Sequence, residues 1–429
     1  MTIVFISAII VIVQAFIGGR TGMNTISLLK NKDWARKNKR QMSILQNIWM
    51  NDGISRKEIG QKLNITKVTV TNCIDKLIES GLVEESTAML SERGRRPVPM
   101  YLKRDLFYSI GISFYDLTFA RIALLNAKAE VLSEVELHDL PGDDWCQKCD
   151  GVIDRIKAML KEQGIEMSAV AGIGISLTGI LRPEDGMVIY SSQFEYNRDF
   201  KLCEYFKAET GKDCFIMNLP HLLAMMEHKW GKAKSMSSFL YFHYHYGVGM
   251  VLNGSLYRGH QCNAGEAGMM QISEDGEQAA DGRKGTVGMI MPFYKVNDRI
   301  EQIIADNGNT MVRNYMSDGG GRVMLPMIVS AIKDGDRICA QLMSEYFEYV
   351  GRTVINLAYI FNPEAVFLPP WTADIPEVSI DIVRRIMGHY GVHNWGLHTD
   401  ILSAQCGDGN LARGAGLLPV NKLLNQNFI

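Results

Sequence analysis

The sequence predicts an α/β protein with a small basic head and a large two-lobed body. In residues 23–104, two short capped helices followed by a β-hairpin predict a winged helix-turn-helix. In residues 105–429, two successive sets of strands alternate with helices, which predicts two α/β lobes. The head holds 16 Lys and Arg against 8 Asp and Glu, and the body holds 28 against 39. A basic head on an acidic body is the charge pattern of a nucleic-acid reader.

The apolar leader in residues 1–22 and the cysteines bear on where the protein resides. Residues 2–17 form an almost uninterrupted apolar run. This run is short for a membrane span and lacks the basic start of a secretory signal. We therefore expect translation to start at Met23, and a membrane tether is the alternative. Eight scattered cysteines, including the pair Cys146 and Cys149, favour a reducing cytoplasm over a disulfide framework or a zinc site.

The capping residues of the head predict its helices. The apolar spacing of residues 42–49 predicts a first helix. Ser55, with Glu58 three residues later, forms a capping box that opens the second helix. Thr66 is the N-cap of the third helix, which Gly81 ends. The apolar stripe of this third helix is Val70, Ile74 and Leu77.

The head is expected to bind double-stranded operator DNA. The third helix exposes residue types that bind base edges and phosphates, as a recognition helix does. A plain helical hairpin with a solvated polar face is the alternative, but the following strands, over 82–86 and 98–102, enclose an arginine-rich tip that suits backbone or minor-groove contact. The predicted DNA-binding residues are Ser55, Arg56, Thr66, Lys67, Thr69, Thr71, Asn72, Arg93, Arg95 and Arg96.

The body is predicted to contain two sets of strands with helices after each set. His243 and His245 alternate along one of these strands, so we expect them to share a face, where sheet packing is favoured over metal binding. The predicted elements are three strands over 108–137, a helix over 145–163, a strand within 169–181, a helix and a strand ending at 218, a helix over 221–230, two strands within 238–259, helices over 324–332 and 336–360, a strand at 365–368, a further helix and a short strand near 401.

From residue 23 to the C-terminus the chain resembles the ROK family, which groups sugar-responsive repressors with bacterial sugar kinases. Four stretches carry the resemblance: SRKEIGQKLNITKVTVTNCIDKLIESGLVEE with its GRRP wing, GVGMVLNGSLYRGHQCNAGEAGM, INLAYIFNPEAVFL and the closing GAGLL. The resemblance implies a two-lobed, actin-like (ribonuclease H-like) body behind the winged helix.

The parts that kinases of this family use for phosphoryl transfer are mostly replaced. A phosphate-binding turn corresponds to residues 112–116, where bulky Phe114 and Tyr115 replace glycines. A second phosphate-binding turn corresponds to residues His245 to Gly249. Pro369 and Pro370 replace a pair of glycines that the kinases carry later in the chain. Leu219 stands where the family has its general base. We therefore expect no kinase activity and no cofactor.

The ligand sites that the resemblance implies are partly retained. Asn218 and Glu266 match positions that bind sugar hydroxyls, and His221 is the nearest substitute for the lost base. The corresponding polar ligands are missing at Leu219, Met269 and Gly288, and a structural role for Glu266 is an equal alternative. The family's structural zinc ligands are replaced by Met269, Ala279, Asp281 and Thr286, so we expect no metal.

These observations predict a transcriptional repressor of carbohydrate genes with a catalytically inactive sugar-kinase-like body. The body is expected to sense a sugar or sugar derivative, to dimerise, or both. A homodimer or dimer of dimers on a palindromic operator is expected, since each recognition helix reads one half-site. The alternative is an ATP-dependent sugar kinase that carries a DNA-binding head.

Overall fold

The computed structural model describes residues 25–86, 90–91, 94–95, 98–114, 119–140, 144–191, 199–275, 278, 282–316, 322–390 and 398–424. The leader, Arg93 and Arg96 lie outside these ranges. The chain divides into two compact units. The first comprises residues 1–175, 201–216 and 415–429, and the second comprises 176–200 and 217–414.

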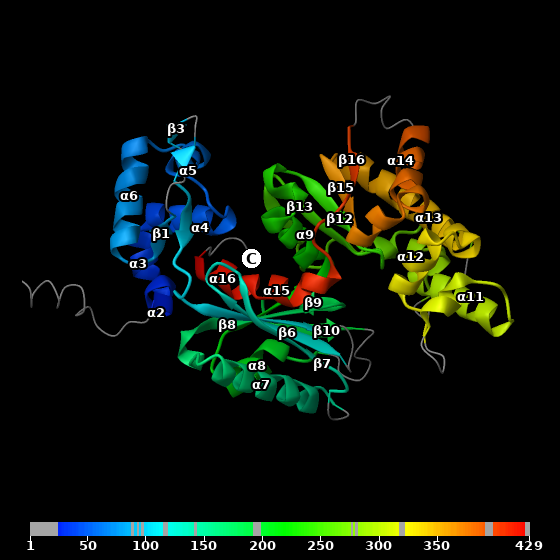
Figure 1. The fold of residues 1–429 in the computed structure, drawn as a ribbon, viewed down its shortest axis with the longest axis horizontal. Coiled ribbons are helices and arrows are strands. Elements are labelled where there is room, and N and C mark those ends of the chain that lie inside the picture. The colour runs from blue at the N-terminus through cyan, green and yellow to red at the C-terminus, as the bar shows by residue number, and fades with distance from the viewer. Residues whose placement is uncertain are drawn as a thin grey trace, which may run out of the picture. The chain divides into compact units, whose positions relative to one another are not determined.

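The head of the first unit is a winged helix-turn-helix, as predicted (Figure 1). The long strands of the wing pair antiparallel, with Glu84 opposite Tyr101. A two-residue ladder at the wing tip pairs Leu90 with Arg95. The elements are α2 (Thr25–Lys30), α3 (Lys32–Lys37), α4 (Lys39–Met50), α5 (Arg56–Leu63), α6 (Lys67–Glu79), β1 (Val83–Glu85), β2 (Leu90–Ser91), β3 (Gly94–Arg95) and β4 (Met100–Leu102).

The predicted caps of the head helices are confirmed. The Ser55 hydroxyl accepts from the Glu58 amide while the Glu58 carboxylate accepts from the Ser55 amide, which is a complete capping box. The Thr66 hydroxyl accepts from the Thr69 amide and opens α6. The turn between the two helices closes at Asn64, whose φ of 50° is left-handed.

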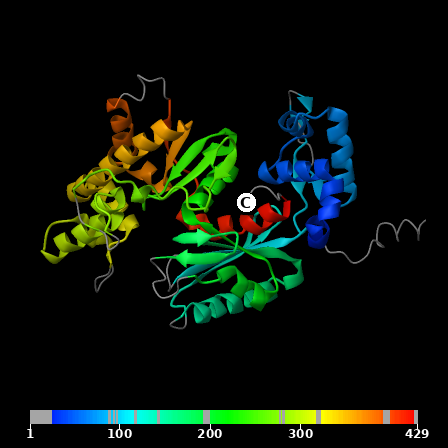
Figure 2. The same ribbon diagram turned by 180° about the vertical axis from the view of Figure 1, so that it is seen from behind.

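The first five-stranded sheet has the order β11-β8-β5-β6-β7. Helices α7 and α8 lie on one face of it, and α16 lies on the other (Figures 1 and 2). A Cβ at Gly174 would lie 1.9 Å from the Ala415 carbonyl oxygen, so only glycine lets β8 approach this C-terminal segment. The elements are β5 (Tyr108–Phe114), β6 (Ala120–Asn126), β7 (Val131–Leu137), α7 (Trp145–Glu162), β8 (Val170–Leu177), α8 (Leu202–Thr210), β11 (Cys214–Asn218) and α16 (Leu417–Leu424).

The second five-stranded sheet repeats this arrangement in the order β14-β13-β12-β15-β16. Its first three strands in the chain are antiparallel neighbours, and β15 and β16 add in parallel. Numbering the strands within each sheet by chain order gives 3-2-1-4-5 in both, so the predicted two-lobed body is confirmed. The strands are β12 (Phe239–Phe242), β13 (Val248–Leu252), β14 (Ser255–Tyr257), β15 (Ala365–Leu368) and β16 (Asp400–Ser403).

Helices surround the second sheet. Helix α9 packs on β12 and β13, and the long α13 packs on α14, which reaches β16. Asp336 caps α13 by accepting from the amides of Ile338 and Cys339. The helices are α9 (Leu219–Trp230), α10 (Val287–Ile290), α11 (Phe293–Ala305), α12 (Leu325–Lys333), α13 (Arg337–Phe361), α14 (Ile380–His389) and α15 (Leu411–Ala415).

Three details of the predicted strands are wrong. Residues 180–190 form a hairpin of β9 (Ile180–Arg182) and β10 (Met187–Tyr190) that was not predicted, because each strand is too short to show a period. Residues 238–259 contain three strands rather than two. The alternation of His243 and His245 along a strand is also wrong, since β12 ends at Phe242 and the turn to β13 follows directly.

Candidate DNA interface and ligand site

Helix α6, the predicted recognition helix, presents a short polar face. Its predicted stripe is fully buried, with Val70 and Ile74 at 0% exposure. Thr66, Lys67 and Asn72 are exposed. Thr69 and Thr71 are half-buried. A face of this kind at the start of a helix suits contact with base edges and phosphates.

Val68 belongs to this face, although sequence reasoning did not select it. Its side chain is 68% exposed, the highest value among the large exposed apolar side chains of the described residues. An apolar side chain on a recognition helix can contact the methyl group of thymine. Its position two residues before Val70, off the buried stripe, was the signal that could have identified it.

Ser55 and Arg56 have partners within the protein. Ser55 is buried and its side chain is used by the capping box. The Arg56 guanidinium lies 2.8 Å from the Asp75 carboxylate and 2.6 Å from that of Glu85, so it links α5 to α6 and to the wing. These ion pairs fix α5, α6 and the wing strand β1 relative to one another, so that all three can contact the same ligand.

Asn218 and Glu266, predicted from the family pattern, lie together in the second unit. The Asn218 amide nitrogen donates to the Gly179 carbonyl at 2.8 Å and to the Glu266 carboxylate at 3.4 Å. Burial raises the pKa of Glu266, and the hydrogen bond from Asn218 opposes that shift. Each side chain keeps hydrogen-bonding capacity beyond these contacts, as a site for hydroxyl groups requires.

His221 has a structural contact beside this pair. Its Nε2 atom lies 2.8 Å from the Ala264 carbonyl oxygen. Burial lowers the pKa of the imidazole, so the neutral form with a proton on Nε2 fits this carbonyl. The ring therefore fixes the loop that carries Glu266.

Leu219, expected from the family resemblance at the position of a general base, is an alkyl residue at the start of a helix. It begins α9 directly after Asn218 and is 7% exposed. An alkyl side chain cannot accept the proton of a sugar hydroxyl.

The turn between β12 and β13, expected from the resemblance to correspond to a phosphate-binding turn, carries bulky side chains. It closes through the His243 amide, which donates to the Gly247 carbonyl, and Tyr246 takes a left-handed φ of 61°. The Tyr244 ring packs 5.1 Å from that of Phe293 and 6.2 Å from that of Trp371. Aromatic rings thus fill the space around the turn.

Both histidines of this turn interact electrostatically with Asp408. His243 Nε2 is 3.4 Å from the Asp408 carboxylate. Burial lowers the pKa of His245 to about 4, so its ring is neutral at pH 7. Burial would raise the pKa of Asp408, but His243 holds it below its usual value. Within this turn, His243 therefore pairs with the Asp408 carboxylate.

In the first unit, Phe114 was expected from the resemblance at the other phosphate-binding position. Its ring is 2% exposed and packs edge-on against Trp145 of α7 at 5.5 Å between centroids. The side chain is part of the core there. Tyr115 and Asp116 lie outside the described residues.

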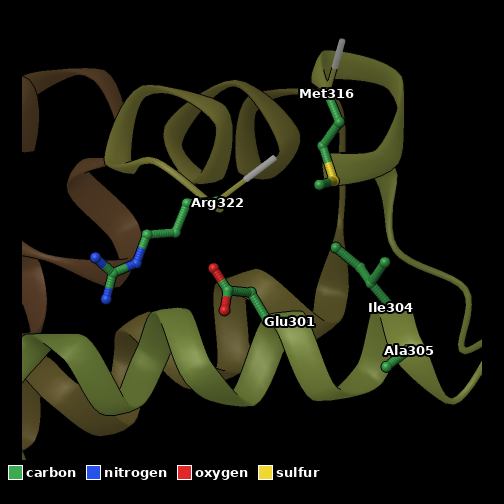
Figure 3. A pocket seen from close by; sticks show the side chains of 5 residues that line it. All are labelled: Glu301, Ile304, Ala305, Met316 and Arg322. Atoms are coloured by element: carbon green, nitrogen blue, oxygen red, sulfur yellow. The ribbon is translucent and has the colours of Figure 1, made fainter. Parts of the chain in front are cut away.

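A further cavity of about 390 Å³ lies between α11 and the segments around Met316 and Arg322 (Figure 3). Figure 3 shows the Glu301 carboxylate directed toward Arg322, and Ile304 beneath Met316. Glu301 also accepts from the Val323 amide at 2.8 Å. None of the predicted ligand residues lines this cavity.

The described residues contain no cluster of three or more His, Cys, Asp or Glu side chains arranged to hold a metal ion. Ala279 and Asp281, expected at the replaced zinc positions, are outside the described ranges. None of the helices in those ranges has the length and apolar character that a bilayer span requires.

Known families match both parts of the chain. The model of the ROK family matches residues 117–421, and that of the MarR family matches residues 37–87. A xylose repressor of Caldicellulosiruptor bescii is 26% identical over 81% of this chain and 86% of its own length. The DNA-binding transcriptional dual regulator NagC of Escherichia coli is 22% identical over 95% of this chain and 97% of its own.

Solved structures match the fold. A ROK family transcriptional regulator described as a homologue of the E. coli MLC protein has a TM-score of 0.72 at 18% identity, covering 91% of this chain and 96% of its own. A ROK family glucokinase from Streptomyces griseus, in complex with glucose and AMPPNP, has a TM-score of 0.59 at 18% identity, covering 72% of this chain and 98% of its own.

Proposed function

The chain belongs to the ROK family, and we propose that it is a sequence-specific DNA-binding repressor of carbohydrate genes whose kinase-like body senses a sugar-derived effector. The observation that carries this proposal is the polar face of α6 on a capped, MarR-type winged helix. The similarity to a xylose repressor and to NagC supports a carbohydrate-linked target. Because its target is DNA, we place its action in the cytoplasm.

DNA binding by a dimer is the mechanism we propose. Lys67, Thr69, Thr71 and Asn72 of α6 enter the major groove, while the arginines of the wing reach the backbone or the minor groove. Two copies of the head read the two halves of a palindromic operator. Selection of bound fragments from a random DNA pool tests this directly: a two-fold symmetric motif is expected, and recovery of unrelated fragments would contradict sequence-specific binding.

The wing variant R95A/R96A is expected to weaken binding to every DNA sequence. Arginine contacts with phosphates release counterions, so losing two of them reduces the slope of log affinity against log salt by roughly two. Fluorescence anisotropy with operator and random duplexes between about 50 and 200 mM salt measures this slope. A loss confined to the operator would instead assign base reading to the wing.

We propose that Asn218, His221 and Glu266 belong to the effector site. Asn218 and Glu266 present a donor and an acceptor to hydroxyl groups, and His221 fixes the loop that carries Glu266. An effector changes operator affinity only if it binds two arrangements of the protein unequally.

We also propose that the DNA-binding head ends, and the body begins, near residue 104.

Sugar kinase activity is the second candidate function, since kinases share this fold. We propose that the chain lacks this activity, because Leu219 cannot serve as a base and Tyr244, Phe293 and Trp371 pack around the replaced phosphate turn. Incubation with ATP and a panel of hexoses and amino sugars is expected to yield no sugar phosphate above a protein-free control. Turnover that scales with protein concentration and survives a further purification step would overturn this proposal.

A further inference from the structure

A cavity of about 470 Å³ lies in the second unit between the β9–β10 hairpin and the loop that precedes Glu266. Its volume falls within the range of about 300–1,000 Å³ for small-molecule sites and exceeds the volume of a single sugar ring. The hairpin contributes three aliphatic and two charged side chains, and the loop contributes mostly polar ones. The lining residues are Ile180, Leu181, Arg182, Glu184, Ile189, His260, Gln261, Cys262 and Asn263.

This cavity adjoins the proposed effector residues. The Asn218 side chain holds the Gly179 carbonyl, and Gly179 precedes Ile180 in the lining. On the other wall, His221 holds the Ala264 carbonyl, which directly follows Asn263. The two contacts join both walls of the cavity to the helix that starts after Asn218. A ligand bound to Asn218 and Glu266 therefore has this cavity next to it.

The hairpin wall presents an exposed apolar side chain to the cavity. Ile180 lines the cavity and is 42% exposed, and its cross-strand partner Tyr190, outside the lining, is 43% exposed. A large exposed apolar side chain gains from being covered by an apolar group. On the opposite wall, the Asn263 Oδ1 atom is buried and has no hydrogen-bond partner within the described part of the chain. A buried acceptor of this kind favours a ligand with a donor.

The charges in the cavity favour a neutral ligand. Arg182 is the only Lys or Arg among the described residues that line it, and its guanidinium is paired with Asp185. Glu184 adds a carboxylate to the same hairpin. A phosphorylated sugar would need unpaired cations or several amide donors.

We propose that this cavity holds the apolar aglycone of a neutral glycoside whose sugar hydroxyls are bound by Asn218 and Glu266. The inference rests on the proposed effector-sensing function and adds the class of ligand.

Calorimetric titration of the full-length protein tests the inference. The probes are methyl and para-nitrophenyl glycosides of glucose, xylose, galactose and N-acetylglucosamine in both anomers, together with glucose phosphate. For at least one sugar, the nitrophenyl glycoside is expected to bind at least about tenfold more tightly than the methyl glycoside, since burial of an aromatic ring stabilises the complex. Equal affinities across the panel, no binding, or preference for glucose phosphate would each overturn the inference.

Two variants test whether the preference for the nitrophenyl glycoside arises in this cavity. Ile180→Asp is expected to abolish the preference for the nitrophenyl glycoside while leaving the affinity for the methyl glycoside unchanged. Val131→Asp, a matched change at a strand residue with 41% exposure, is expected to leave both affinities unchanged. An equal loss of both affinities in Ile180→Asp contradicts an aglycone site. Operator binding, measured on the same samples, separates the outcomes: if it persists without glycoside binding, only the inference fails, and if it is absent, the proposed function fails.

Discussion

A protein carrying Lys67→Glu is expected to lose at least about 100-fold in operator affinity, which corresponds to about 3 kcal/mol. Lys67 is the first residue of α6 and is exposed at the end of the helix that is proposed to enter the groove. The substitution removes a phosphate partner and places a carboxylate against the negative backbone. The slope of log affinity against log salt is expected to fall by at least about one. Anisotropy titration of a labelled operator measures both quantities.

Arg36→Glu provides a control with the same change in net charge. Arg36 lies on α3, outside the helix-turn-helix and the wing, and its side chain is 80% exposed. A small reduction in affinity is expected there, because exposed charges farther than about 10 Å from the duplex are largely screened. If the two variants lose affinity equally, the effect is one of net charge and α6 has no special role. Thermal unfolding of both variants should match that of the wild type, since both side chains are exposed.

Glu227→Ala is expected to destabilise the second unit by about 3–5 kcal/mol. The Glu227 side chain is completely buried in α9. One carboxylate oxygen accepts from the Lys232 amide at 2.8 Å, and the other accepts from the amides of Gln405 and Cys406 at 3.0 and 2.8 Å. Alanine would leave three backbone donors without their acceptor next to a new cavity. Urea unfolding followed by tryptophan fluorescence measures the loss.

Glu345→Ala is the matched control for this prediction. Glu345 is an exposed residue of α13 whose carboxylate accepts from the Gln341 side chain one turn earlier. Its replacement is expected to cost less than about 0.5 kcal/mol. Glu227→Gln should lie between the two, since its amide keeps one oxygen acceptor. A loss below about 1 kcal/mol in Glu227→Ala would mean that water or a backbone shift satisfies these amides.

Local signals explain why the head could be predicted in detail. The caps at Ser55 and Thr66 depend on residues three positions away, so the sequence contains both partners of each contact. For the body, the sequence predicted most of the helices and strands, and the family resemblance predicted the two-lobed arrangement. The short β9–β10 hairpin was not, because strands of three and four residues show no clear period and pair only in the folded chain.

The candidate ligand site shows the same limit. Family resemblance selected Asn218 and Glu266, but the contact between them spans 48 residues and became visible only in the fold. The cavity beside them is lined by segments about 70 residues apart, and no local pattern links these segments. The turn at His243 misled the prediction because alternating His and Tyr residues imitate a strand, whereas the hydrogen bond from the His243 amide to the Gly247 carbonyl closes a turn.

The chain order of the two units has a consequence for synthesis. The last strand of the first sheet to be synthesised is β11. The first unit also includes the much later helix α16, and the close approach of Gly174 to Ala415 packs this C-terminal segment onto the sheet. During synthesis, nearly 200 further residues must therefore leave the ribosome before the unit that carries α6 can bind its last helix. A nascent or prematurely terminated chain would expose the apolar surface that α16 covers, so chaperones and proteases can distinguish it from the finished regulator.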